Sequence, residues 1–103
     1  MLVAIAIPVF TNQLEKSRES TDLANVRSAY AEIMTQYLED GSAHTMTVTA
    51  QQKVADWQTS PQPGLTTQIN GSESTLTFSA KTTGSYTVAL TVGTSGEVSV
   101  SVS

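Results

Sequence analysis

Residues 23–38 read LANVRSAYAEIMTQYL, and this stretch decides the fold. Its apolar side chains recur three and four residues apart, which places them on one face of an α-helix. The predicted core of this helix consists of Leu23, Val26, Tyr30, Ile33, Met34 and Tyr37. A stripe of this kind needs a cover within its own domain, and we expect Gly41 to end the helix.

The helix extends from this stretch back toward the start of the chain. Residues 2–40 contain one proline, Pro8, and no glycine, and they are rich in residue types that favour helices. The helical part, 1–40, divides into an apolar stretch at 1–10, a polar stretch at 11–22 and the sheet-packing stretch at 23–38. Residues 41–103 complete the same single domain, because 103 residues are too few for two.

The apolar stretch lies ahead of helix residues that offer it no core. The apolar run at 2–10 has nine residues, too few to span a bilayer, which takes about 20 residues. It also lacks the basic start and the small-residue cleavage site of a secretory signal. We therefore expect the end of a longer apolar helix that packs against copies of the chain. The candidate contact residues are Ile5, Ile7, Pro8, Val9, Phe10 and Leu14.

The polar stretch at 11–22 has no apolar stripe and is expected to protrude. Its charged residues form a run of mixed sign and comprise Glu15, Lys16, Arg18, Glu19 and Asp22. Two interpretations stay open for them. They form a solvated helix face, or they form a surface matched to copies of the same chain.

The second part of the chain alternates apolar and polar residues with a period of two, which indicates β-strands. Segments 86–92 and 98–103 form a hairpin through the loop at 93–96, and a strand at 76–80 is expected to extend them into a three-strand meander. Further strands are predicted at 65–69 and around 45–49, whereas 51–57 fits either a strand or a short helix. The predicted fold class is α+β, a long N-terminal helix packed across an antiparallel sheet of about four strands.

Composition argues against enzymatic and nucleic-acid-binding functions. The net charge is −4, no cysteine is present, and the single histidine, His44, is expected to be exposed and idle. The chain offers no base next to a nucleophile, no cluster of carboxylates with metal-ligand spacing and no glycine-rich phosphate loop. We expect no enzyme, no cofactor, no metal, no nucleic-acid partner and no small-molecule substrate.

Residues 5–31, IAIPVFTNQLEKSRESTDLANVRSAYA, resemble the N-terminal helix of type IV pilins and the related pseudopilins, in the form common in Gram-positive bacteria. The resemblance covers residues 2 to about 38, while the β part is similar to the family in architecture only. It implies a structural subunit of a surface filament that serves adhesion, motility or aggregation and polymerises through its N-terminal helix. The implied partners are copies of the chain and a pilus assembly machinery in the membrane.

The same resemblance implies features that are not found among these residues. The complete family protein begins with a prepilin peptidase site, is methylated at its N-terminus and carries a glutamate within a membrane-spanning helix. Such a protein sits in the membrane before assembly and on the cell surface afterwards. Two alternatives remain, a pseudopilin of a type II secretion or competence machine and a stalked carbohydrate- or surface-binding module that uses Trp57.

Overall fold

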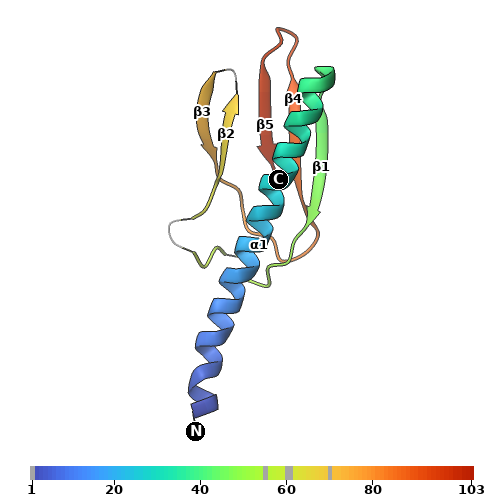
Figure 1. Ribbon diagram of the computed structural model, residues 1–103. Coiled ribbons are helices and arrows are strands. Elements are labelled where there is room, and N and C mark those ends of the chain that lie inside the picture. The colour runs from blue at the N-terminus through green and yellow to red at the C-terminus, as the bar shows by residue number, and fades with distance from the viewer. Residues whose placement is uncertain (1, 55, 60–61, 70) are drawn as a thin grey trace.

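The computed structural model describes residues 2–54, 56–59, 62–69 and 71–103, with side chains from Gln13 onward. Helix α1, Leu2–Asp40, is followed by strands β1, His44–Thr49, β2, Leu65–Ile69, β3, Ser72–Leu76, β4, Ser85–Val92, and β5, Val98–Val102. One long N-terminal helix packs against antiparallel strands, which confirms the predicted α+β fold class (Figure 1).

The strands form two antiparallel sheets, where the sequence predicted one sheet of about four strands. One sheet has the order β1–β4–β5, and the other is the hairpin β2–β3. In the first sheet Met46 is opposite Val88 and Leu90 is opposite Val100, so the β4–β5 hairpin expected around the loop at 93–96 is present. We call these the three-stranded sheet and the two-stranded sheet.

The expected meander of 76–80, 86–92 and 98–103 is wrong. Strand β3 ends at Leu76 and pairs with β2, and the second neighbour of β4 is β1. The backbone beyond Leu76 turns to other partners, because the Phe78 carbonyl accepts hydrogen bonds from the Trp57 indole and the Gln62 amide, both at 2.9 Å. A carbonyl used in this way is not part of a strand ladder.

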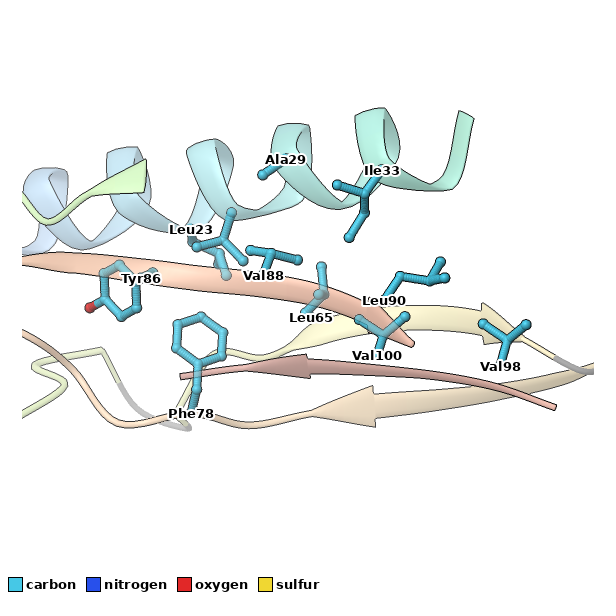
Figure 2. Close-up of a cluster of buried hydrophobic side chains, with 11 residues drawn as sticks. Leu23, Ala29, Ile33, Leu65, Phe78, Tyr86, Val88, Leu90, Val98 and Val100 are labelled. Atoms are coloured by element: carbon cyan, nitrogen blue, oxygen red, sulfur yellow. The ribbon is translucent and has the colours of Figure 1, made fainter. Parts of the chain in front are cut away.

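The core lies between α1 and the inner faces of the strands (Figure 2). Three of the helix residues predicted for it, Leu23, Val26 and Ile33, are buried, and the other three, Tyr30, Met34 and Tyr37, are partly buried against the same cluster. From the strands and loops the buried hydrophobic residues are Leu65, Phe78, Tyr86, Val88, Leu90, Val98 and Val100. In β4 every second residue from Tyr86 to Leu90 faces the core, and in β5 the valines alternate with serines in the same way.

The first part of α1 extends past both sheets, so that the molecule measures 64 × 23 × 18 Å along its principal axes (Figure 1). Within the described part of the chain, no helix is long and apolar enough to cross a membrane. The segment between β1 and β2, for which strand and helix both remained open, is neither over its described residues from Gln51 to Thr59.

Candidate functional site

The residues predicted to drive assembly lie on the part of α1 that extends past the sheets. The side chains of Ile5, Ile7, Pro8, Val9 and Phe10 lie outside the described residues, and only the helical backbone that carries them is described. Leu14 is the first predicted contact residue with a described side chain, and it is 40% exposed although it is apolar. The predicted contact between copies therefore stays a prediction.

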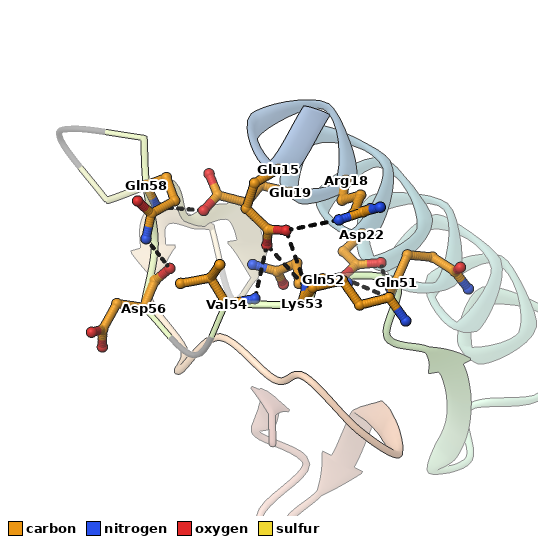
Figure 3. Close-up of polar contacts among 10 residues, drawn as sticks. All are labelled: Glu15, Arg18, Glu19, Asp22, Gln51, Gln52, Lys53, Val54, Asp56 and Gln58. Atoms are coloured by element: carbon orange, nitrogen blue, oxygen red, sulfur yellow. Dashed lines mark hydrogen bonds and ion pairs between the residues drawn. The ribbon is translucent and has the colours of Figure 1, made fainter. Parts of the chain in front are cut away.

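The polar stretch of α1 carries an unexpected arrangement of acidic side chains. Glu15, Glu19 and Asp22 are only 3%, 2% and 0% exposed. Their spacing of four and three residues places them on one helix face, and that face packs against the connection between β1 and β2 (Figure 3). The expectation that this stretch protrudes without a partner in its own chain is wrong for these three residues.

Each carboxylate accepts hydrogen bonds from two consecutive backbone N–H groups of the connection. Figure 3 draws the residues of these bonds except Thr59. Asp22 accepts from Gln51 at 2.9 Å and from Gln52 at 3.2 Å.

Glu15 accepts from Lys53 at 3.1 Å and from Val54 at 3.2 Å. Glu19 accepts from the N–H groups of Gln58 and Thr59, and the Thr59 hydroxyl adds a third bond at 2.7 Å.

We name Glu15, Glu19 and Asp22 the carboxylate clamp. A connection without a strand or helix of its own has backbone N–H groups that need acceptors when buried, and the clamp supplies them. Bonds from N–H groups to an ionised carboxylate are stronger than bonds between neutral groups. The clamp therefore fixes the connection on the helix at the level where α1 leaves the domain.

The clamp has three carboxylates, and the ion pair described for them is that of Glu15 with Arg18. The half-buried Arg18 lies 3.3 Å from Glu15, whereas Lys16, the other cation of this stretch, is exposed. Burial raises the pKa of Asp22; the N–H groups of Gln51 and Gln52 oppose this, and the nearby Glu15 adds to it. Because the three carboxylates are occupied within the chain, Lys16 and Arg18 are the predicted inter-subunit charges that keep an accessible side chain.

The sequence contained a signal for the clamp. Positions 15, 19 and 22 continue, at spacings of four, three and four, into position 26 of the apolar stripe. They therefore belong to the helix face that contains Val26 and Ile33. The interpretation of these three acidic residues as part of a solvated helix face is therefore wrong, because they lie on the buried face.

Next to the clamp, a set of aromatic and polar side chains connects the segment between β1 and β2 with the core. The Tyr86 hydroxyl donates to the Gln52 side-chain oxygen and accepts from the Lys81 N–H at 2.9 Å. Burial raises the pKa of Tyr86. The Trp57 ring meets Phe78 edge-on, with centroids 5.6 Å apart, and Phe78 meets Tyr86 in the same way at 5.4 Å. Trp57 thus contributes to packing, with its indole N–H bonded inside the molecule.

His44 is half-buried and paired with Asp40, so the expectation that its side chain is exposed is wrong. Its Nε2 lies 2.9 Å from both carboxylate oxygens of Asp40, where α1 ends and β1 begins. The hydrogen bond to His44 holds the pKa of Asp40 below its ordinary value, and the Ser42 N–H contributes to the same effect. Within the described ranges, no group of three or more histidine, aspartate or glutamate side chains could hold a metal ion.

Comparison of the chain with protein-family models, with curated proteins and with solved structures found no match.

Proposed function

We propose that the chain is the structural subunit of a type IV pilus-like surface filament that polymerises through its N-terminal helix. One observation supports this most, the division of α1 into two parts. From Glu15 to Tyr37 one helix face is used within the molecule, by the clamp and by the core. The apolar residues at 2–10 precede that face, on the part of the helix that extends past both sheets (Figure 1).

Assembly by this route has a clear driving force. Burying one large apolar side chain contributes about 1.5 to 3 kcal/mol, and the stretch at 2–10 offers several such side chains in each copy. Identical head-to-tail contacts that do not close into a ring produce a helical filament. The helices would occupy the filament centre, and the β parts would face outward on the cell surface.

The carboxylate clamp has a part in this proposal. A helix that holds a filament together must transmit force to the domain it carries. The clamp attaches α1 to the connection by hydrogen bonds from six backbone N–H groups, at the point where the helix leaves the domain. The helix therefore emerges in a defined direction, which a regular filament requires.

The proposal is tested by electron microscopy of cells that produce the protein. Phe10→Asp is expected to reduce the number of filaments by about tenfold or more, because a carboxylate would have to be buried between apolar helices. The matched control is Leu38→Asp, an equivalent exchange at a side chain that is 77% exposed on the same helix. It should leave filaments in place.

Thermal unfolding of the purified variants shows whether the domain itself is intact. Unchanged filament numbers in Phe10→Asp, or no filaments with the wild-type chain, would contradict the proposal. Assemblies that remain short and confined to the cell envelope would support the pseudopilin alternative.

A further inference from the structure

The three-stranded sheet ends in an open edge at β1. The strand order is β1–β4–β5, and among the described residues no strand pairs with the outer side of β1 (Figure 1). An open edge presents unpaired N–H and C=O groups, and most proteins protect such edges with charges, prolines or bulges. Strand β1 reads HTMTVT and has no proline, lysine, arginine or acidic residue.

The hydrogen-bond pattern identifies which groups face outward. The Ala50 N–H donates to the Gly84 carbonyl at 3.0 Å, and this pair continues the β1–β4 register. Because bonded pairs alternate along an antiparallel ladder, Val48 and Met46 also bond toward β4. Thr87 and Ser103 exchange two bonds at 2.8 and 3.0 Å, which places the alternate residues of β4 on the β5 side and agrees with this assignment.

The outward N–H and C=O groups of β1 therefore belong to Thr45, Thr47 and Thr49. These are also the three residues of the strand whose side chains are exposed. The threonines alternate without interruption with Met46 and Val48, whose side chains face the core. Among the described residues no partner bonds to these three N–H groups and three C=O groups, so the edge combines open donors and acceptors with a uniform polar face.

We propose that this edge is an interaction surface for a second copy of the chain, with the two β1 strands antiparallel and Thr47 opposite Thr47. In this register Thr45 lies opposite Thr49, so hydroxyl side chains meet on one face and Met46 meets Val48 on the other. The sheets of the two copies join into one.

A second copy fits the edge for two reasons. The strand is complementary to itself. In this register the exposed threonines of both copies lie on one face of the joined sheet, and Met46 and Val48 of both copies lie on the other. A chain of net charge −4 repels its copies. This contact adds no repulsion between opposing side chains, because β1 contains no acidic residue, no lysine and no arginine. The surface buried between two strands is much smaller than that of a standard interface, which buries about 1,600 Å². The free chains should accordingly associate weakly, with a dissociation constant of the order of 1 mM.

The symmetry of the contact has a consequence that rests on the proposed function. The two-fold axis reverses β1, and α1 runs beside β1 in the three-dimensional fold (Figure 1), so the helices of the paired copies point in opposite directions. Neighbours within one filament have helices that point the same way. The contact would therefore join two filaments or two free subunits.

Hydrogen exchange of the purified 103-residue chain tests the contact without any filament. At high protein concentration the amides of Thr45, Thr47 and Thr49 should exchange several-fold more slowly than after a dilution of about a hundredfold, while the amides of Met46 and Val48 should not change. Exchange at the three threonines that does not depend on concentration would overturn the proposal.

Charge exchange at the centre of the contact provides the second test. Thr47→Lys should weaken association by about tenfold or more, because two ammonium groups would lie opposite each other. Mixing the Thr47→Lys and Thr47→Glu variants should restore association as a heterodimer. The matched control, Thr91→Lys, adds the same charge on central strand β4 and should not interfere.

The outcomes distinguish this contact from association through the apolar stretch at 2–10. Association that persists unchanged in Thr47→Lys would overturn the proposal, and so would a mixture of the two charged variants that associates no better than either alone. Neither result depends on whether the chain forms filaments.

Discussion

Glu15, Glu19 and Asp22 are buried where apolar residues would ordinarily continue the helix stripe. A buried carboxylate is tolerated when its oxygens are satisfied by hydrogen bonds, and each of these accepts two adjacent backbone N–H groups. The backbone donors also gain from these bonds, because the described residues from Gln51 to Thr59 form no helix or strand that would supply other acceptors. At the scale of single residues, the clamp is therefore a substitute for secondary structure.

Glu19→Ala should destabilise the domain by about 1 to 3 kcal/mol, because it removes the hydrogen bonds that the buried carboxylate accepts from the N–H groups of Gln58 and Thr59 and from the Thr59 hydroxyl. Glu32→Ala, the same exchange at an exposed position of α1, should change stability by no more than about 0.5 kcal/mol. Urea unfolding of both variants measures the two free energies. Equal effects at the two positions would show that the clamp contributes nothing to stability.

Asp22 should produce a pH dependence opposite to that of a paired surface carboxylate. Its pKa is raised above the ordinary 3.8 by burial, so its stability contribution is present below pH 3.8 and is lost as the pH rises through the raised pKa. The free energy of unfolding of the wild-type chain relative to Asp22→Asn should therefore fall as the pH rises through this range.

Asp40 is the comparison for that measurement. Its pKa is lowered by the bond to His44, so its contribution is present above the ordinary pKa and is lost as the pH falls through the lowered value. Unfolding experiments on Asp40→Asn across the same acidic range should give a slope of opposite sign. The same sign for both variants would contradict the assignment for Asp22.

Residue spacing predicted the core but not the clamp. The apolar recurrence from Leu23 to Tyr37 identified the helix residues that meet the strands, because burial of such side chains depends on periodicity alone. The helix spacing places Glu19 on the buried face, but its partners are backbone donors about 40 residues away in the chain, and no local pattern identifies those donors. A charged side chain usually indicates contact with solvent. In the clamp, the charged side chains instead accept hydrogen bonds from backbone N–H groups.

At the scale of elements, alternation predicted most of the strands and the hairpin at 93–96, but neither the bounds of β3 nor the division into two sheets. The strands predicted at 65–69, 86–92 and 98–103 correspond to β2, β4 and β5, since side-chain direction is a local property. The partner of β4 is β1, about 40 residues earlier. That pairing depends on how the intervening connection is held on α1.

The two-stranded sheet depends on a close approach at its base. A Cβ atom at Gly64 would lie 2.7 Å from the Leu76 carbonyl oxygen and 2.7 Å from the Thr75 Cγ2 atom. Gly64→Ala should therefore cost about 1 to 3 kcal/mol, because backbone must shift to admit the methyl group. Thr66→Ala, at an exposed position of β2, is the control. Thermal unfolding that gives the same midpoint for Gly64→Ala and the wild-type chain would show that the hairpin moves freely at this point.

At the scale of the whole molecule, α1 unites parts that do not pair with one another. The three-stranded sheet packs on it through Val88 and Leu90, and the two-stranded sheet approaches it through Leu65. The Gln68 N–H also donates to the Tyr30 hydroxyl at 3.3 Å. The connection joins the same helix through the clamp. Removal of packing on the core-facing side of α1 should consequently affect all of these parts together.

Ile33→Ala should lower the free energy of unfolding by about 2 to 5 kcal/mol, because Ile33 is fully buried in the shared core. Two probes can follow the loss. The fluorescence of Trp57, the single tryptophan, reports the connection, and far-ultraviolet circular dichroism reports mainly α1. Both should show one transition with the same midpoint in the wild-type chain, and both midpoints should move by the same amount in the variant. A Trp57 transition that stays in place while the helix signal shifts would mean that the connection and its aromatic contacts unfold independently of the helix.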